Sequence, residues 1–454
     1  MGPLSGMAGS RGGPSATPAD TGAAARGLVG REDLLAALGA LTSVPAPRGS
    51  ERDCAVAVHA FAARRWPALR WLVDPLSAQD GGRGAGLVGE SGSGGAPDLL
   101  ICSHLDTSLS GVPDDDWPVN GPGPAPARGF ELEGDRLRGF GLAVARAPAA
   151  AALVAHAAAA RALTEAELPH RLGLLLAGSG THRSPFGGPG AGAPELPGGV
   201  ARRLAGGRRP AAVLIAKCGP YGILYEEPGA CFLRVRLTTR PGAVLARAAA
   251  TPSGGLPTHL GTLIGAAEKW RTEWTTAPGA RGGQVAREVG IGAVRCGAPH
   301  KPDLLPAVAD LHLYAVLAPG DEPAAVAALL RDRLAAALAG GPLEGCALTV
   351  DHSQGHPAGR TSPTASIVRA AHDAWTLARG GLAPTPTGWT GSTDGVMFRV
   401  AGVDTVRLGP HAASDPSDPR LDLLSLTELL DFARMYADIA VRWATGHGGG
   451  AKGR

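Results

Sequence analysis

The segment that most constrains the fold is residues 99–107, where an apolar run ends in a polar burst. Leu99–Cys102 are four consecutive apolar residues, and His104 and Asp106 follow two positions apart. Such a run is typical of a buried parallel strand, and α/β folds bind ligands at the carboxyl ends of these strands. Side chains two apart on an extended chain point the same way. The pattern therefore predicts that Asp106 orients the imidazole of His104, either in a metal site or in a plain strand-end cap.

Composition excludes several classes of function. The 454 residues exceed what a single hydrophobic core organises, so two domains are expected. The formal charge of +3 is spread along the chain without a basic block, which excludes a nucleic-acid partner. The six cysteines show no C-x-x-C spacing and predict reduced thiols in a cytoplasmic protein. Uninterrupted apolar runs are shorter than the roughly 18 residues that span a bilayer, so no membrane partner is expected.

The order of predicted elements indicates one domain interrupted by another. Residues 28–227 alternate between helical and strand patterns, which predicts an α/β domain with a mostly parallel sheet flanked by helices. Residues 228–355 contain an amphipathic strand at Cys231–Thr239 and further strand and helix patterns, typical of a two-layer α+β unit. The α/β pattern returns over residues 356–446.

Three segments have the composition of irregular chain. Residues 1–27 and 447–454 are predicted to be disordered tails, because they are rich in small and polar residues. Residues 178–207 are rich in Gly and Pro, and are predicted to form a long loop that acts as a lid or is disordered.

The order of motifs resembles one family of hydrolases. The motifs are His104 and Asp106 after a strand, Trp117 before a Pro/Gly loop, the turn 139–141 that opens an Ala-rich helix, the inserted segment 303–306, and G-S-T-D-G at 391–395. Over roughly residues 28–445 the chain resembles the zinc-dependent aminoacylase and carboxypeptidase family, which includes acetylornithine deacetylases, succinyl-diaminopimelate desuccinylases and glutamate carboxypeptidases. The resemblance implies a zinc-exopeptidase-like domain, an inserted dimerisation domain, and amide hydrolysis by two bridged zinc ions.

Most metal-site positions of that family are substituted in this chain. His104 matches the first histidine ligand, and Asp106 matches the carboxylate that orients it. Val144 stands in place of the bridging aspartate, Gly180 in place of the general base, and Lys217 in place of an acidic ligand. Two adjacent dications repel strongly and require anionic ligands. Two zinc ions are therefore not expected.

Two further residues could complete a smaller metal site. His182 follows the lost ligand position by one residue, and Asp415 lies where the last histidine ligand would be. With His104 they would hold a single zinc or other divalent metal at most; otherwise no metal binds. The alternatives are a loop histidine and an Asp-Pro turn. The substrate arginine is likewise replaced, by Val316, and the family's histidine in the inserted domain is missing.

Two other groups of residues are candidates for the site. Ser392, Thr393 and Asp394 match a loop that lines the cleft in relatives, although the same residue types form ordinary turns. Cys218 follows Lys217, whose charge would lower the thiol pKa and make Cys218 a nucleophile. The alternative is an inert cysteine at a strand end.

These observations favour a relative of dinuclear zinc amide hydrolases, of the deacylase or dipeptidase type, with a degraded metal site. Such a protein would be retained for binding a small molecule or a partner. The alternative is a divergent hydrolase or acyl-transfer enzyme that acts on N-acyl amino acids or peptide-like substrates, using one metal or metal-free His104 and Asp106 chemistry. The expected partners are a small molecule of this class and a second copy or a homologue bound through the inserted domain.

Overall fold

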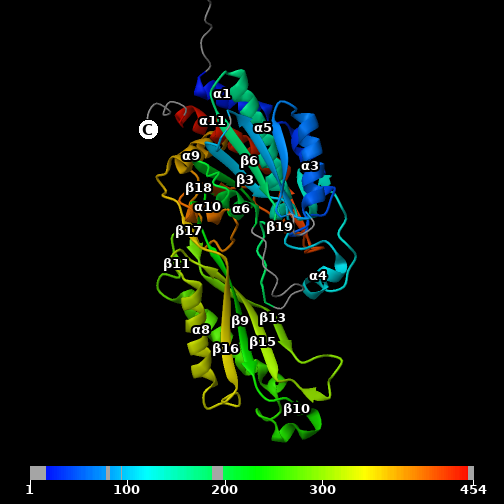
Figure 1. Ribbon diagram of the computed structural model, residues 1–454. Helices are drawn as coiled ribbons and strands as arrows, with labels where there is room; N and C mark the ends of the chain where they lie inside the picture. The colour runs from blue at the N-terminus through cyan, green and yellow to red at the C-terminus, as the bar shows by residue number, and fades with distance from the viewer. Residues whose placement is uncertain (1–16, 78–81, 94, 187–197, 448–454) are drawn as a thin grey trace, which may run out of the picture.

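The computed structural model describes residues 17–77, 82–93, 95–186 and 198–447. Figure 1 shows an α/β part at the top and a smaller, elongated sheet with helices below it. The larger part is built on a six-stranded sheet in the order β1-β2-β6-β3-β7-β18. Its strands are β1 (Arg70–Pro75), β2 (Ala85–Gly92), β6 (Arg171–Ala177), β3 (Leu99–His104), β7 (Ala212–Ala216) and β18 (Asp404–Leu408).

The middle of this sheet is parallel and its β1–β2 edge is antiparallel. Strands β6, β3, β7 and β18 run parallel to one another, whereas β2 runs antiparallel to both β1 and β6. All six residues of β3 are buried, because both of its neighbours and both faces of the sheet are covered. The apolar run 99–102 is the centre of the sheet, as the sequence predicts.

Helices cover both faces of the sheet. One face carries the main core, formed with α2 (Arg31–Thr42), α3 (Arg52–Arg65), α5 (Ala147–Glu165), α9 (Ser366–Arg379) and α11 (Leu426–His447). The opposite face is covered by α6 (Gly199–Ala205) and α10 (Val396–Val400). The segment Leu142–Glu165 is long and apolar enough to cross a membrane, but 89% of its most apolar window is buried inside the fold, as in a core helix.

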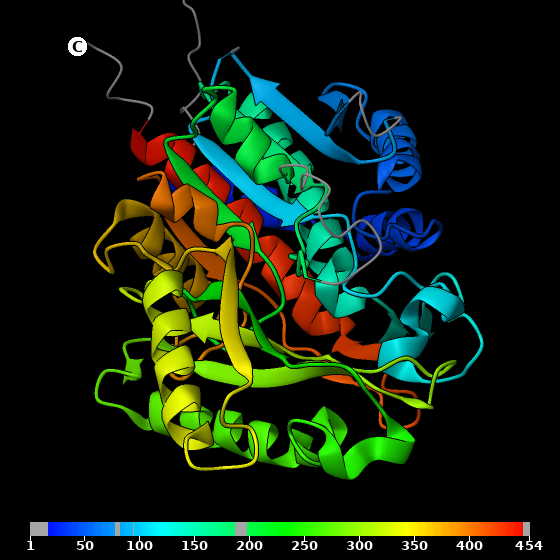
Figure 2. The same cartoon turned by 60° about the horizontal axis from the view of Figure 1, so that its bottom comes forward.

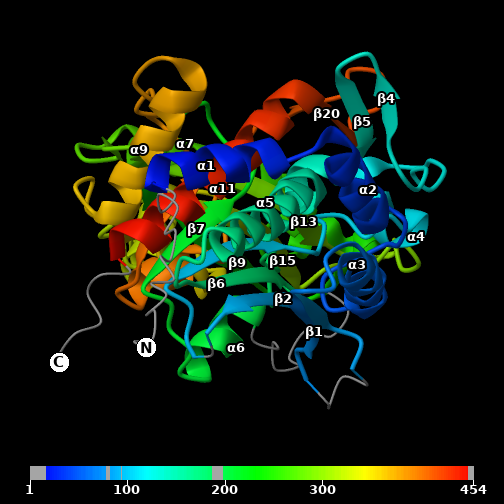
Figure 3. The same ribbon diagram turned by 90° about the horizontal axis from the view of Figure 1, so that it is seen from above.

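The N-terminal segment corrects one prediction. Residues 18–27, predicted from their composition to belong to a disordered tail, lie in helix α1 (Pro18–Leu28). Thr17 and Asp20 form a capping box at its start, and an ion pair joins Arg26 to Asp438 of α11. Figure 3 shows α1 against α11 and α5. The buried residues Thr21, Gly22 and Ala25 are small, which allows this close packing. The Ala- and Gly-rich composition that is also typical of disordered chain therefore suits the helix to its place.

The segment predicted as one long loop is also partly helical. Helix α6 occupies residues 199–205, and Val200 packs into the core on its side of the sheet. Residues 187–197 lie outside the described part of the chain. Gly198 at the N-cap and Gly199 at the first helical position hide the start of this helix in the sequence, because neither provides a capping side chain.

The inserted sheet is entirely antiparallel, in the order β13-β15-β9-β16. Its strands are β9 (Gly229–Thr238), β13 (Glu288–Cys296), β15 (Val308–Leu317) and β16 (Ala347–His356), and its helices are α7 (Leu260–Thr276) and α8 (Pro323–Leu338). Alternate residues of β9 are buried against the helices, while Arg234 and Arg236 pair with acids on neighbouring strands. Figure 2 shows the two helices against this sheet. The predicted fold class is confirmed.

Short elements complete the fold around these two sheets. A small four-stranded sheet joins β4 (Glu131–Glu133), β5 (Arg136–Phe140), β20 (Leu421–Ser425) and β19 (Ala413–Ser414). The remaining pieces are α4 (Pro113–Asn120), η1 (Leu142–Arg146), β8 (Glu226–Glu227), β10 (Gly242–Ala243), η2 (Val244–Ala249), η3 (Leu256–His259), β11 (Arg281–Gly282), β12 (Val285–Ala286), β14 (Leu304–Leu305) and β17 (Gly359–Arg360).

A buried histidine in α5 predicts acid sensitivity. The ring of His156 packs edge-on against Trp71, and neither ring nitrogen has a hydrogen-bond partner in the described part of the chain. Burial, followed by the nearby His170, lowers the pKa of His156 to about 3. The unfolded chain therefore binds this proton more readily than the native chain below the usual pKa of about 6.5, so stability falls as the pH falls.

We expect this one group to reduce the free energy of unfolding by about 1.6 kcal/mol between pH 6.5 and pH 5. Urea unfolding at both pH values measures the loss. The His156→Leu variant should show a correspondingly smaller loss. An equal pH dependence in the variant and the parent would contradict the assignment.

Candidate functional site

The candidate site lies where the parallel strands of the large sheet end. His104 is the last residue of β3 and pairs in register with Ala177, the last residue of β6. Gly180 follows β6, and Lys217 follows β7 directly. Asp394 reaches the same point from the loop before α10. The topology thus brings together residues that are far apart in the sequence, at the sheet edge where α/β folds bind ligands.

The imidazole of His104 is held on both of its nitrogen atoms. Its Nδ1 lies 3.2 Å from Oδ1 of Asp106 and 2.9 Å from the backbone oxygen of the same residue. Its Nε2 lies 2.7 Å from Nζ of Lys217. A lysine ammonium can only donate, so Nε2 accepts and Nδ1 carries the proton that Asp106 accepts. Burial, and then the charge of Lys217, lower the pKa of His104, which keeps the ring neutral at neutral pH.

The carboxylate of Asp106 is fixed by the turn after β6. It accepts the backbone N–H groups of Gly180 and Thr181, each at 2.7 Å, and the hydroxyl of Thr181. Burial alone would raise the pKa of Asp106, but His104 and these donors hold it well below its usual range. Asp106 is therefore ionised at neutral pH and accepts a hydrogen bond from His104.

Lys217 and Asp394 form the other half of the cluster. The Lys217 side chain is buried, and desolvation followed by the charge of Arg407 lowers its pKa to about 8. Burial raises the pKa of Asp394 to about 7, against the opposing attraction of Lys217. The Oδ2 atom of Asp394 is buried without a hydrogen-bond partner among the described residues. The site thus holds an ammonium and a carboxyl group that both titrate near neutral pH.

The surroundings of Gly180 leave no room for a side chain. A Cβ atom at this position would lie 2.5 Å from Cβ of His104 and 3.1 Å from Oδ2 of Asp394. The former distance is shorter than any ordinary carbon–carbon contact. Because Gly180 lies so close to His104, its N–H reaches the carboxylate of Asp106, which in turn contacts His104.

Behind the site lies a group of buried charges that sequence reasoning missed. Glu227 of β8 accepts hydrogen bonds from Arg407 at 3.0 Å, from Arg399 at 3.4 Å and from the hydroxyl of Thr393 at 2.6 Å. Glu51 lies nearer to Asp106, and burial followed by the charge of Asp106 raises its pKa to about 7. Neither acid stands in a recognisable motif, so only the topology could identify them.

His182 lies at the junction with the inserted sheet. Its ring stacks on Tyr314 of β15 with centroids 5.2 Å apart, and it meets His356 of β16 edge-on at 5.1 Å. Burial, and then Lys217, lower the pKa of His182 to about 4. A cavity of about 190 Å³ opens beside it. Its polar lining consists of Arg48, Ser179, Thr181, His182, Arg183, His356 and Asp394.

The other predicted site residues have different surroundings. The carboxylate of Asp415 is bound by Arg138 and by the backbone and hydroxyl of Ser417, beside the small sheet of β19. The hydroxyl of Thr393 donates a hydrogen bond to the buried Glu227, and the hydroxyl of Ser392 is buried without a partner among the described residues. Burial outweighs the nearby cations and raises the pKa of the Cys218 thiol well above its usual range. A protonated thiol is a poor nucleophile.

The residues present do not fit a pair of metal ions. Within the described ranges, no three His, Cys, Asp or Glu side chains are arranged to hold a metal. The structure therefore does not assemble His104, His182 and Asp415 into a ligand group. The Nε2 atom of His104, which would face a metal, accepts a hydrogen bond from Lys217 instead. A cation directly beside that atom opposes the approach of a dication.

Comparison with known proteins identifies the fold. No family model and no curated protein sequence matches the chain. The structure is similar to aminopeptidase PepT from Bacillus cereus, with a TM-score of 0.61 and 14% identity over 92% of this chain and 100% of that one. It is also similar to human carnosine dipeptidase 1, with a TM-score of 0.62 and 12% identity over 95% of this chain and 100% of the other.

A third similar structure is the M20 family metallo-carboxypeptidase Sso-CP2 from Sulfolobus solfataricus. Its TM-score is 0.60, with 14% identity over 91% of this chain and 99% of that one. The YXEP protein from Bacillus subtilis, described as a dinuclear metal binding peptidase of the M20 family, is similar with a TM-score of 0.54 and 14% identity over 90% of this chain and 97% of that one. The resemblance inferred from the sequence motifs is thus confirmed at the level of the fold.

The contact at Gly180 predicts a cost for any side chain there. Gly180→Ala should destabilise the protein by about 1–3 kcal/mol, because the added methyl overlaps His104 and the backbone must shift. Gly265→Ala in helix α7 is the matched control, since nothing lies within 4 Å of its new methyl group, and it should be neutral or slightly stabilising. Chemical unfolding measures both. Equal stability of Gly180→Ala and the parent would contradict the described packing.

Proposed function

We propose that this protein is a metal-independent, ligand-binding relative of the M20 metallopeptidases, in which the ammonium of Lys217 takes the place of a metal ion. Its ligand is a small molecule of the N-acyl amino acid or peptide-like class, bound in the cavity between the large sheet and the inserted sheet. We further propose that it acts in the cytoplasm, in keeping with its unpaired cysteines.

One observation carries the proposal: Nζ of Lys217 lies 2.7 Å from Nε2 of His104. The lysine occupies the direction in which this histidine would bind a metal, and it brings its own positive charge. A single ammonium needs fewer anions around it than two dications do. Val144 and Gly180 in place of two acids agree with that smaller charge, and Asp106 and Asp394 supply the acids that remain.

The cavity beside the site supports the ligand class. Its lining combines the guanidinium groups of Arg48 and Arg183 with the carboxyl of Asp394 and two neutral histidine rings. Arginine suits a carboxylate, whereas a protonated Asp394 can donate a hydrogen bond to a carbonyl oxygen. Met397 adds apolar surface. A molecule with one carboxylate and one amide carbonyl would be complementary in charge and polarity to this lining.

A second function is favoured by the connectivity of the same residues. In many enzymes an acid orients a base, and the base accepts a proton from a nucleophile. Asp106, His104 and the amine of Lys217 are hydrogen-bonded in that order. In that reading His104 accepts a proton, and the protein turns over N-acyl or peptide-like substrates without a metal. It ranks second, because Nε2 is already engaged by Lys217 while the amine carries its proton below a pH of about 8.

The proposal predicts that the protein contains less than one zinc per chain when it is purified without chelator. Calorimetry with a panel of N-acetyl amino acids and dipeptides should detect binding that EDTA leaves unchanged. Product analysis on the same panel tests the second function, for which turnover without added metal is required. Two zinc ions per chain, together with turnover that EDTA abolishes, would overturn the proposal.

The effect of Lys217 on its neighbours can be measured directly. In Lys217→Met the pKa values of both His104 and Asp394 should rise, because the Lys217 charge lowers each of them in the parent. Nuclear magnetic resonance of the labelled histidine rings and carboxyl groups follows both titrations. Lys301→Met, which removes an exposed lysine paired with Asp303, should shift neither. A His104 pKa that is the same in Lys217→Met and the parent would contradict the contact.

A further inference from the structure

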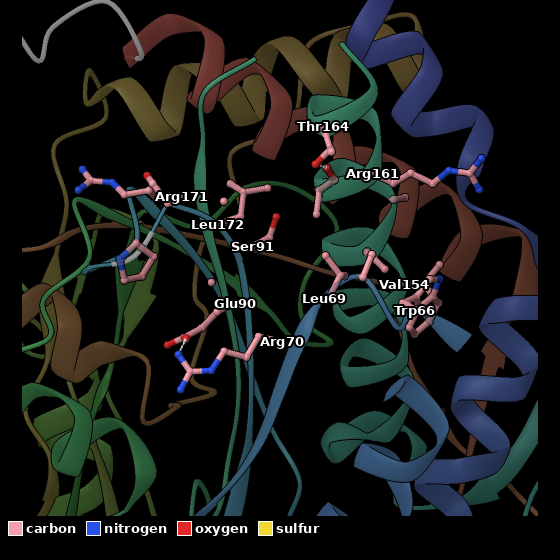
Figure 4. A pocket seen from close by; sticks show the side chains of 18 of the residues that line it. Trp66, Leu69, Arg70, Glu90, Ser91, Val154, Arg161, Thr164, Arg171 and Leu172 are labelled. Carbon is pink, nitrogen blue, oxygen red and sulfur yellow. Dashed lines mark hydrogen bonds and ion pairs between the residues drawn. The ribbon is translucent and has the colours of Figure 1, made fainter. Parts of the chain in front are cut away.

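A second cavity, of about 1170 Å³, lies at the opposite end of the large sheet from His104. It surrounds the point where β2 ends and where β1 and β6 begin, and Figure 4 shows its lining from close by. The function proposed above makes no use of it. None of the residues that line the cavity beside His182 also lines this one.

The cavity follows from a mismatch in strand length. Strand β1 begins at Arg70, opposite Glu90 of β2, but β2 continues for two more residues to Gly92, which pairs with Arg171 of β6. The space beside Ser91 and Gly92 is therefore not filled by β1. Helix α3 has already ended at Arg65, and the second half of α5 presents mostly alanine. Small side chains and a short strand leave the volume open.

The cavity has two chemically distinct parts. The part next to α5, here called the apolar lobe, consists of Trp66, Leu69, Val154, Ala157 and Ala158. The arginine lobe consists of Arg70, Arg171, Arg203 and Arg208 together with Glu90. Figure 4 shows the Arg70–Glu90 pair on one side, and Trp66, Leu69 and Val154 on the other. An apolar wall beside a few converging polar groups is typical of a small-molecule site.

The arginine lobe has more positive charge than its acids neutralise. Glu90 is shared by Arg70 at 3.0 Å and Arg208 at 3.7 Å. Arg171 pairs with Asp98, which lies outside the lobe. By contrast, the two arginines beside the apolar lobe are each matched, Arg65 by Asp33 and Arg161 by Glu165. The excess of cations is therefore confined to one end of the cavity.

Arg203 of α6 is the residue that points to a ligand. It is only 9% exposed, its Nε atom has no hydrogen-bond partner, and no acid within the described residues lies within ion-pair distance of it. Burial lowers the pKa of Arg203 although Glu90 lies near. A buried, charged donor without a partner is costly. An anion in the arginine lobe would remove that cost.

We propose that this cavity binds an amphiphilic anion, whose head group accepts hydrogen bonds from Arg203 and whose hydrocarbon body lies along the apolar lobe. A carboxylate and a phosphate monoester share the required head-group chemistry, since both accept paired N–H donors from a guanidinium. The unbranched alanine surface of α5 suits a flexible alkyl chain. The cavity volume exceeds the volume of one such chain, so the chain would not fill the whole apolar lobe.

The test uses the full chain and calorimetry with dodecanoate below its micellar concentration. Binding should weaken by up to about fourfold for each methylene removed, as for apolar burial, and acetate should not bind measurably. Dodecyl phosphate is measured in the same way, and whichever of the two anions binds with the higher affinity identifies the head group as a carboxylate or a phosphate monoester. Dodecanol should bind at least tenfold more weakly than the anions. Equal affinity for dodecanol and dodecanoate, or no binding of either anion, would overturn the proposal.

Two variants separate the two lobes. Arg203→Met should weaken dodecanoate by about tenfold to a hundredfold and leave dodecanol unchanged. Arg331→Met removes a distant, exposed arginine paired with Asp332, and it should leave dodecanoate binding as in the parent. Ala158→Phe should weaken both ligands, because it fills the apolar lobe. Thermal unfolding verifies that each variant is folded, and unchanged dodecanoate affinity in folded Arg203→Met and Ala158→Phe would contradict the site.

Discussion

The contact between Lys217 and His104 is the interaction on which the account of the site depends. It commits the Nε2 atom of His104 as an acceptor, which fixes the proton on Nδ1 and explains why Asp106 stays ionised next to it. The rest of the site follows from this arrangement. Under the proposed function, this single buried ammonium stands where a metal ion would bind His104.

Gly180 shows that the changes at the site are linked. Its backbone N–H is one of the donors that hold Asp106, and its lack of a side chain lets His104 approach. Introducing an acid at this position would displace His104, which contacts Lys217. Gly180 and Lys217 both contact His104, so a change at either position is expected to alter how the other is packed.

The sequence predicted those features that short-range patterns encode. The buried strand at 99–102, the pairing of His104 with Asp106 and the alternating strand in the inserted sheet all depend on neighbours within a few residues. Helix α1 was missed because its Ala/Gly composition is also typical of disorder, while its packing partner Asp438 lies at the other end of the chain. The direct contact of Lys217 with His104, the buried Glu227 and the second cavity arise from strand order and strand length, which no local pattern records.

Addition of zinc to the isotopically labelled protein, followed by nuclear magnetic resonance of the His104 ring, tests the central claim most directly. The account predicts a neutral ring with its proton on Nδ1, whose Nε2 signal is unchanged by one or two equivalents of zinc. A shift of the Nε2 signal that saturates at a stoichiometric amount of zinc would show that the metal displaces Lys217, and would contradict the account.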